Sequence, residues 1–473
     1  MSQRPDLSKL TSEEKDALIE ALWARLGEQD TRIQELERRL RLDSTNSGKP
    51  PSSDGYQKPP RPTNLREKTD RTSGGQDGHE GKNLRQADNP DKIVDHYPTT
   101  CPGCHAALGL GQATGYRKRQ VFDLPKPQPL EVREHRAYRC QCPCCGAETE
   151  AAFPTGVTAP VQYGPNIAAL VVYLHHWHFI PEDRLAELMG EVFGVELSAA
   201  TIASMAQRKA EEWTGLAAHI GAQVKQAPVK HLDETGLRIA GVLQWLHVAS
   251  TWLLTFYRTS RHRGTMLEGV LGIVVHDFWR PYFTLDDVEH ALCNAHHLRE
   301  LKALSTLEKE PWAQAMFRFL RHACHAANLA RRRDERLKPT FLTWLSARYD
   351  RILAQGLAFH ESQPPLATAA PKRRGRMRRR PGHNLLLRLR DHKADTLRFL
   401  STPAVPFTNN QAERDLRMMK LKQKISGCFR AETGAQTFAT LRTVLSTARK
   451  QRWNLLDTLL QPSDALLCKL RTA

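Results

Sequence analysis

The sequence feature that most constrains the fold is a change in the spacing of apolar residues near residue 229. Upstream, residues 164–225 repeat apolar positions at helical spacing. Downstream, three short segments rich in β-branched and aromatic residues are separated by turns at Gly241 and around Thr251. The segments predicted as strands are Val229–Ile239, Gln244–Ser250 and Trp252–Arg258. A chain that combines such strands with long helical segments belongs to the α/β class.

A fourth apolar strand is predicted over Leu271–His276, after a short helix near Gly264–Gly269. Asp233 lies within the first strand and Asp277 directly follows the fourth. That order of acids is expected of a ribonuclease-H-like sheet. Helical periodicity returns over about residues 286–400. We therefore expect an α/β protein with a ribonuclease-H-like catalytic core that carries a helical insertion.

The segment from Thr408 to Arg430 is predicted to form a helix whose first turn Asn410 can cap. Its apolar face carries Ala412, Leu416 and Met419. On a neighbouring face Glu413 heads a basic stripe, formed by Arg417, Lys420 and Lys424. This arrangement can present one acid to a phosphodiester while the cations hold the strand. The same residues also fit a capping box between Asn410 and Glu413, or a surface ion pair between Glu413 and Arg417.

Three gathered carboxylates repel one another, and divalent cations relieve that repulsion. Two Mg²⁺ (or Mn²⁺) ions about 4 Å apart can activate the attacking oxygen and stabilise the leaving oxygen in a displacement at phosphorus. We choose Asp233, Asp277 and Glu413 as the ligands. Each has rivals in the sequence: Glu234 for Asp233, the group Asp286, Asp287 and Glu289 for Asp277, and Asp415 for Glu413. Strand alternation turns Glu234 to the other face, and Asp415 lies about 200° around the helix from Glu413.

Six of the ten cysteines fall between Cys101 and Cys145, a clustering that indicates metal binding in a reducing compartment. They include two C-P-x-C knuckles separated by a strand-rich stretch, with the ligands Cys101, Cys104, Cys142 and Cys145. Paired knuckles predict a tetrahedral Zn²⁺ site of the ribbon type. Four thiolates leave no open position, so this zinc would be structural. Cys140 and Cys144 are spare, and a ligand set that uses Cys140 stays open.

Residues 12–42 carry apolar residues at alternating three- and four-residue steps, interrupted by Gln29: Ile19, Leu22, Leu26, Ile33, Leu36 and Leu40. This pattern predicts a short coiled coil that makes the protein a homo-oligomer, or else a helix packed on its own chain. Farther on, Pro181–Met189, a glycine and Leu197–Met205 follow the rhythm of a helix–turn–helix with Ser198 as a cap, or of a plain helical hairpin. We expect a coiled-coil helix at residues 1–45, a flexible linker at 46–90, a zinc ribbon at 91–155, a helical, possible DNA-binding segment at 156–228, and a catalytic domain at 229–473 with its insertion at about 286–400.

The chain is strongly basic, with 69 Lys and Arg against 51 Asp and Glu and a net charge of +18. Such a charge favours a nucleic-acid partner. The run Lys372–Arg380, which includes Arg373 and Arg374, has seven cations in nine residues and predicts a loop that touches phosphates or is simply solvated. We found neither an apolar run of about 20 residues nor the hydrophobic region of a signal peptide. We therefore expect no membrane partner and a cytoplasmic location.

Several motifs follow one another along most of the chain: Asn46–Asp54, Gly74–Gly81, the two C-P-x-C pairs, His231–Gly236, His276–Asp277, Cys293–Leu301 and Asn409–Arg414. With this set the chain resembles a DDE transposase of the insertion sequence 66 family. The resemblance implies that Asp233, Asp277 and Glu413 match the family's two aspartates and its glutamate. It also implies binding of double-stranded DNA at the inverted repeats of a mobile element, cleavage that exposes 3′-hydroxyls, and strand transfer into target DNA without a covalent enzyme intermediate. Helper proteins of the same element are further candidate partners. The run from His276 to Tyr282 departs from the Asp-Gly-Tyr of many members.

The motif Cys293-x-x-His296 has two interpretations. It could form half of a second metal site with Cys324 or His325, or it could bring His296 and Arg299 near the acids to orient a scissile phosphate or a water molecule. Two alternative functions also remain at this stage. One is an inactive zinc-ribbon DNA-binding protein derived from a transposase, and the other is a simple ribonuclease-H-like nuclease.

Overall fold

A computed structural model describes the chain over residues 11–41, 86–109, 111, 113–123, 130–264, 268–364 and 379–472. Most of the predicted linker lies outside the described residues, as do Arg373 and Arg374 of the basic run and the motifs Asn46–Asp54 and Gly74–Gly81. Within the described residues, no helix is both long enough and apolar enough to cross a membrane.

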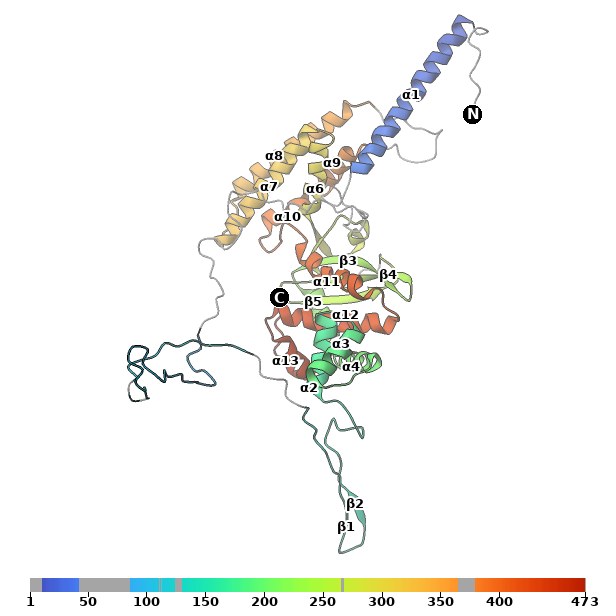
Figure 1. Ribbon diagram of the computed structural model, residues 1–473. Coiled ribbons are helices and arrows are strands. Elements are labelled where there is room, and N and C mark those ends of the chain that lie inside the picture. Colours follow the sequence, from blue (N-terminus) through green and yellow to red (C-terminus); the bar gives the residue numbers. More distant parts are fainter. Residues whose placement is uncertain are drawn as a thin grey trace.

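A mixed five-stranded sheet forms the centre of the fold (Figure 1). Its strands are β3 (Val229–Ile239), β4 (Val242–Ser250), β5 (Thr255–Ser260), β6 (Gly272–His276) and β7 (Val288–Leu292). They lie in the order β5-β4-β3-β6-β7. Strands β3, β4 and β5 are antiparallel neighbours, whereas β6 runs parallel to both β3 and β7. The first predicted strand has the bounds that the alternation of its residues indicated.

One expectation about this region was wrong. Helical structure was predicted from residue 286, but the chain first forms β7 there, and its helices begin only at Asn294. The polar sequence Asp286-Asp287-Val-Glu-His shows no apolar strand pattern. Strand β7 is a short edge strand, and such a strand need not be apolar throughout. The predicted short helix near Gly264–Gly269 lies largely outside the described residues; Gly269, which is described, has a positive φ of 66°.

Helices pack on both faces of the sheet (Figure 1). Helix α11 (Asn410–Ser426) lies across β3 and β4, and helix α12 (Glu432–Lys450) runs along β5. The hydroxyls of Thr443 and Thr447 on α12 accept the N–H groups of Tyr257 and Thr255 at 3.0 and 3.1 Å. These bonds occupy donors of an edge strand that would otherwise be free to pair with another chain.

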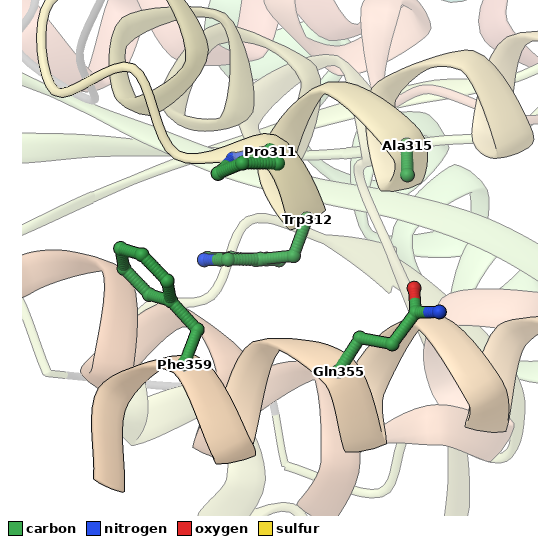
Figure 2. A pocket seen from close by; sticks show the side chains of 5 residues that line it. All are labelled: Pro311, Trp312, Ala315, Gln355 and Phe359. Atoms are coloured by element: carbon green, nitrogen blue, oxygen red, sulfur yellow. The ribbon is translucent and has the colours of Figure 1, made fainter. Parts of the chain in front are cut away.

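The helical insertion has its own core. It consists of α6 (Asn294–Thr306), α7 (Pro311–Arg332), α8 (Pro339–Glu361), α9 (Pro381–Asp391) and α10 (Lys393–Ser401). Its apolar side chains pack together with Val275 of β6 and Ala291 of β7. A pocket of about 400 Å³ opens between α7 and α8, and Figure 2 shows the rings of Trp312 and Phe359 at its wall. None of its lining side chains can titrate, so it is not a candidate catalytic centre.

The segment upstream of the sheet is helical, as expected. It contains α2 (Pro165–Val172), the π-helical turn η4 (Tyr173–Trp177), α3 (Glu182–Phe193), α4 (Ala199–Glu212) and α5 (Thr214–Gln226). Gly194 ends α3 in the left-handed conformation, and the Ser198 hydroxyl caps α4 by accepting the N–H of Thr201 at 3.1 Å. Leu185 on α3 and Ile202 on α4 share one small core. The two predicted helices and the turn between them are therefore present, as both the helix–turn–helix and the helical-hairpin interpretations require.

The remaining elements flank this body. The N-terminal helix α1 (Ser12–Arg41) precedes the cysteine-rich region, whose only strands among the described residues are β1 (Arg139–Gln141) and β2 (Glu148–Glu150). The stretch between the knuckles is therefore not strand-rich where it is described. A 3₁₀ turn, η5 (Arg280–Thr284), follows β6, and α13 (Leu455–Leu460) and α14 (Ser463–Cys468) close the chain.

Candidate active site

The register of the sheet brings Asp233 and Asp277 together. The parallel ladder between β3 and β6 pairs His231 with Val275, and each aspartate lies two residues farther along its strand. Continuing that register sets the two aspartates side by side. They share the sheet face of Val275, which packs against the helical insertion, whereas Leu232 and Val274 belong to the core on the other face.

Asn409 fastens the start of α11 to the same strand. Its side-chain amide donates to the carbonyl of Leu232 at 2.8 Å, and its Oδ1 lies 2.8 Å from Nδ1 of His231. Its backbone N–H donates to Sγ of Cys293 at 3.1 Å. The helix begins at Asn410, so Asn409 occupies the N-cap position without capping the helix through its side chain. The predicted cap at Asn410 is therefore wrong, and Glu413 lies one turn beyond this anchor.

The electrostatics of Asp233 show that the three acids interact. Burial raises the pKa of Asp233 well above its ordinary value, and the charges of Glu234, Asp277 and Glu413 raise it further. Burial also raises the pKa of Asp277 to about 6, with the charge of Glu234 adding to the effect. The N–H of Trp279, which donates to Asp277 at 3.0 Å, acts in the opposite direction. A divalent cation that bound such buried acids would replace their protons and favour their ionised forms.

Glu234, the rival of Asp233, is already paired. It follows Asp233 in β3, so its side chain leaves the opposite face, and only 1% of that side chain is exposed. Nη2 of Arg263 lies 2.7 Å from its carboxylate, and the hydroxyl of Tyr282 donates to it. The guanidinium of Arg263 lies over the rings of Trp245 and Trp279, at 5.0 and 4.1 Å from their centres. The sequence analysis missed Arg263 and Tyr282, because both lie outside the strands and no motif marks them.

The other rivals are also engaged or exposed. Asp286 and Asp287 are exposed, and Glu289 pairs with Arg398. Asp415 accepts hydrogen bonds from Ser250 at 2.5 Å and from Lys450 at 2.8 Å. Asp415 thus connects α11 to β4 and α12 and has a structural role.

Glu413 lies beside the Cys293-x-x-His296 motif. The ligand atoms of Cys293, His296 and Glu413 all lie within 4.8 Å of one another. Oε1 of Glu413 and Nδ1 of His296 are buried and lack hydrogen-bond partners among the described residues. Burial and the nearby charge of Arg299 lower the pKa of His296 to about 4, so its imidazole is neutral at pH 7. The partner of this motif is therefore Glu413, and neither Cys324 nor His325 belongs to the group.

These donors suit divalent metal ions. The carboxylates of Asp233 and Asp277 are hard oxygen ligands, as Mg²⁺ prefers. The Glu413 position offers oxygen together with imidazole and thiol, a set of donors that suits Zn²⁺ better than Mg²⁺. The unpartnered Oε1 of Glu413 is the structural feature that a cation would satisfy.

The basic stripe begins at the same place. A cavity of about 290 Å³ is lined by Asn410, Glu413, Arg414 and Arg417. Arg417, Lys420 and Lys424 are exposed along α11. Glu413 and Arg417 form no ion pair in the part of the chain that the structure describes, so that alternative for Glu413 is not supported.

Both cysteine knuckles are formed locally. The N–H of Cys101 donates to Ala106 at 2.9 Å, and that of Cys142 donates to Ala147 at 2.8 Å, so the two turns are equivalent. Hydrogen bonds from Cys104 and Gly103 lower the pKa of Cys101, and those from Cys145 and Cys144 lower the pKa of Cys142. Each knuckle therefore contains a cysteine whose lowered pKa favours the thiolate form that binds metal. The four thiols do not converge within 4.8 Å, since the described residues contain no such group other than the one at Glu413.

The fold and the site define a mixed α/β protein preceded by a pair of cysteine knuckles. Asp233 of β3 lies near enough to Asp277 and Glu413 for their charges to raise its pKa, but the ligand atoms of the three acids do not all lie within 4.8 Å of one another. Residues 160–437 match the family model described as the transposase IS66 family. Residues 98–146 match the zinc-finger binding domain of transposase IS66, and residues 2–85 match a family of unknown function. No curated protein is significantly similar to the chain. The chain belongs to the IS66 transposase family, and the zinc-finger match supports a structural zinc.

Proposed function

We propose that this protein is a DDE transposase that binds the inverted repeats at the ends of an insertion element, cleaves the strands there and transfers them into target DNA. The observation that carries the proposal is the position of Asp233, whose pKa is raised by burial and then by Glu234, Asp277 and Glu413. The order β5-β4-β3-β6-β7, with two antiparallel pairs among β3, β4 and β5 and two parallel pairs formed by β6, supports a ribonuclease-H-like core. The family match supports the transposase class.

Asp233, Asp277 and Glu413 would hold two Mg²⁺ or Mn²⁺ ions. When bound, such ions supply charge neutralisation and an activated oxygen nucleophile for an in-line displacement at phosphorus. Asn409 fixes the distance between Glu413 and β3 through its bonds to His231 and Leu232. The neutral imidazole of His296 lies beside Glu413 without a hydrogen bond to it, and it would orient a scissile phosphate or a water molecule there. Arg417, Lys420 and Lys424 would hold the DNA backbone along α11.

The zinc ribbon and the helical pair α3–α4 are the proposed DNA-recognition parts, with Cys101, Cys104, Cys142 and Cys145 as the zinc ligands. The equivalent hydrogen bonds of the two knuckles support this ligand set. Cys140 lies in β1, opposite Thr149, outside the second knuckle. Action on chromosomal DNA would locate the protein at the bacterial nucleoid, with helper proteins of the element as further partners.

Labelled DNA carrying the element ends provides the test of the proposed catalytic residues. Asp233→Asn, Asp277→Asn and Glu413→Gln should each abolish cleavage and strand transfer, because each removes a metal-binding charge, while end binding persists. Asp286→Asn, which changes an exposed acid near β7, should keep full activity. Strand transfer by any of the first three variants would remove that residue from the metal site. End binding without metal-dependent cleavage by the natural protein would instead identify an inactive DNA-binding derivative.

A further inference from the structure

Cys293, His296 and Glu413 form a group of metal-ligating side chains that the proposed catalytic chemistry uses only in part. Cys293 lies at the N-cap of α6, directly after β7, and His296 belongs to the first turn of that helix. Their ligand atoms and that of Glu413 on α11 all lie within 4.8 Å of one another. Oε1 of Glu413 and Nδ1 of His296 are buried without hydrogen-bond partners among the described residues. Buried polar atoms are ordinarily paired, so two such atoms beside a thiol indicate a ligand that both can bind.

We propose that Cys293, His296 and Glu413 bind a Zn²⁺ ion that holds the protein in an inactive state. The inhibitory role rests on the proposed function, because it assumes that the same Glu413 carboxylate serves the catalytic ions. The binding of zinc does not depend on that function. It concerns a different site from the cysteine knuckles, to which the structural zinc belongs.

The chemistry of the three donors selects zinc. Thiolate, imidazole and carboxylate are all ligands of tetrahedral Zn²⁺, whose bonds of about 2.0–2.3 Å set the ligand atoms about 3.3–3.8 Å apart. Separations of up to 4.8 Å are only slightly wider, and rotations of the side chains can close the difference. Mg²⁺ instead prefers six oxygen ligands and binds sulfur poorly. The fourth zinc position would be open to water.

The surroundings of the sulfur favour a bound cation. Burial and the charge of Glu413 raise the pKa of the Cys293 thiol to about 12. Backbone hydrogen bonds from Asn409, Ala295 and His296 to the sulfur act in the opposite direction. A cation cancels the repulsion between thiolate and carboxylate, and the thiol proton passes to solvent as the bond between zinc and sulfur forms.

Zinc at this position would keep Glu413 away from the catalytic ions. In this structure the ligand atoms of Asp233, Asp277 and Glu413 do not all lie within 4.8 Å of one another, whereas Glu413 lies within that distance of Cys293 and His296. Shared catalytic ions require the Glu413 carboxylate to approach the two aspartates. A zinc ion that also binds a buried thiolate opposes this movement.

Zinc content of the full-length protein tests the site. Four thiolates at the knuckles should retain zinc through dialysis, whereas the three donors here should load only when Zn²⁺ is added. In dialysis against micromolar free Zn²⁺, the natural protein should contain about one more zinc per chain than Cys293→Ser. Serine can still accept the N–H of Asn409 but supplies no thiolate. The control is Cys324→Ser, which changes a half-buried cysteine outside the group and should keep the natural zinc content.

A second ligand variant and a check of folding accompany this measurement. His296→Gln should lose the same zinc ion, and only its zinc content is compared. Urea unfolding without added metal checks that each variant is folded. Equal zinc contents of the natural protein, Cys293→Ser and His296→Gln overturn the proposed site.

Competition for Glu413 is measured with and without DNA. In Mg²⁺-dependent cleavage of labelled element ends, Cys293→Ser should require at least about tenfold more Zn²⁺ for inhibition than the natural protein or Cys324→Ser. Without DNA, Zn²⁺ should weaken the binding of Mn²⁺, followed by electron paramagnetic resonance, in the natural protein but not in Cys293→Ser. Equal effects of zinc on the natural protein and Cys293→Ser overturn the inhibitory role. Uptake of the additional zinc by a natural protein that cleaves no DNA counts against the catalytic proposal alone, since zinc content and Mn²⁺ binding still decide this inference.

Discussion

Replacing Asp277 with asparagine should stabilise the metal-free protein at neutral pH. Burial and the charge of Glu234 raise the pKa of Asp277 from its ordinary 3.8 to about 6. That difference corresponds to about 3 kcal/mol, because one pH unit is worth about 1.4 kcal/mol. The ionised carboxylate imposes this cost on the folded state at pH 7.5. Asparagine has nearly the shape of the protonated acid, and its amide oxygen can still accept the N–H of Trp279.

The pH dependence gives the sign of the effect. Below about pH 3 the carboxyl is protonated in both the folded and the unfolded chain, so the variant and the natural protein should be equally stable. As pH rises from about 4 to about 6, the unfolded chain releases this proton while the folded protein still holds it. The natural protein therefore loses stability over this interval, and the advantage of Asp277→Asn grows to as much as about 3 kcal/mol.

Urea unfolding at pH 5 and pH 7.5 measures this advantage. The buffer should contain no Mg²⁺ or Mn²⁺ and no chelator, so that any structural zinc stays in place. Adding Mg²⁺ at pH 7.5 should then stabilise the natural protein but not the variant. Asp286→Asn is the control, because Asp286 is exposed. A variant that is less stable than the natural protein at pH 7.5, or whose advantage does not depend on pH, would refute the electrostatic reasoning.

Two other substitutions test the anchor and the zinc ligands. Asn409→Ala should lower the free energy of unfolding by about 2–3 kcal/mol and slow strand transfer, because it leaves the carbonyl of Leu232 and the ring of His231 unpaired in a buried site. The control is Asn410→Ala, which changes an exposed neighbour. Identical urea unfolding curves for the two variants would contradict this prediction. Cys101→Ser should remove bound zinc, as measured by metal analysis, and should weaken the footprint on the element ends. Cys140→Ser should preserve both the zinc and the footprint. The reverse outcome would make Cys140 a zinc ligand.

Local patterns in the sequence were enough to predict many elements. The alternation of residues gave the bounds of β3, and glycine and serine signals gave the boundary between α3 and α4. Such patterns are local, because strand and helix geometry repeat every two or 3.6 residues. The short edge strand β7 escaped prediction, since a five-residue segment with polar members carries little periodic signal.

The candidate site was only partly accessible in this way. Because side chains alternate between the two faces of β3, the sequence alone separates Asp233 from Glu234. The position of Asp277 after an apolar strand makes it a candidate ligand. Nothing local connects these residues to Arg263 or Tyr282, which neutralise Glu234. Nothing local shows that Asn409 would bind β3 rather than cap α11.

The sequence by itself therefore determined the heptad pattern of α1, the cysteine knuckles, most of the helices and strands, and the choice of Asp233, Asp277 and Glu413 as candidate acids. Only the tertiary structure decided which groups surround those acids: the parallel register that aligns Asp233 with Asp277, the Asn409 anchor that brings Glu413 to β3, and the contact of Glu413 with His296 and Cys293. The physical reason is that backbone geometry acts over a few residues, whereas these contacts join segments more than 40 residues apart. Their partners are selected by packing and burial of the whole core.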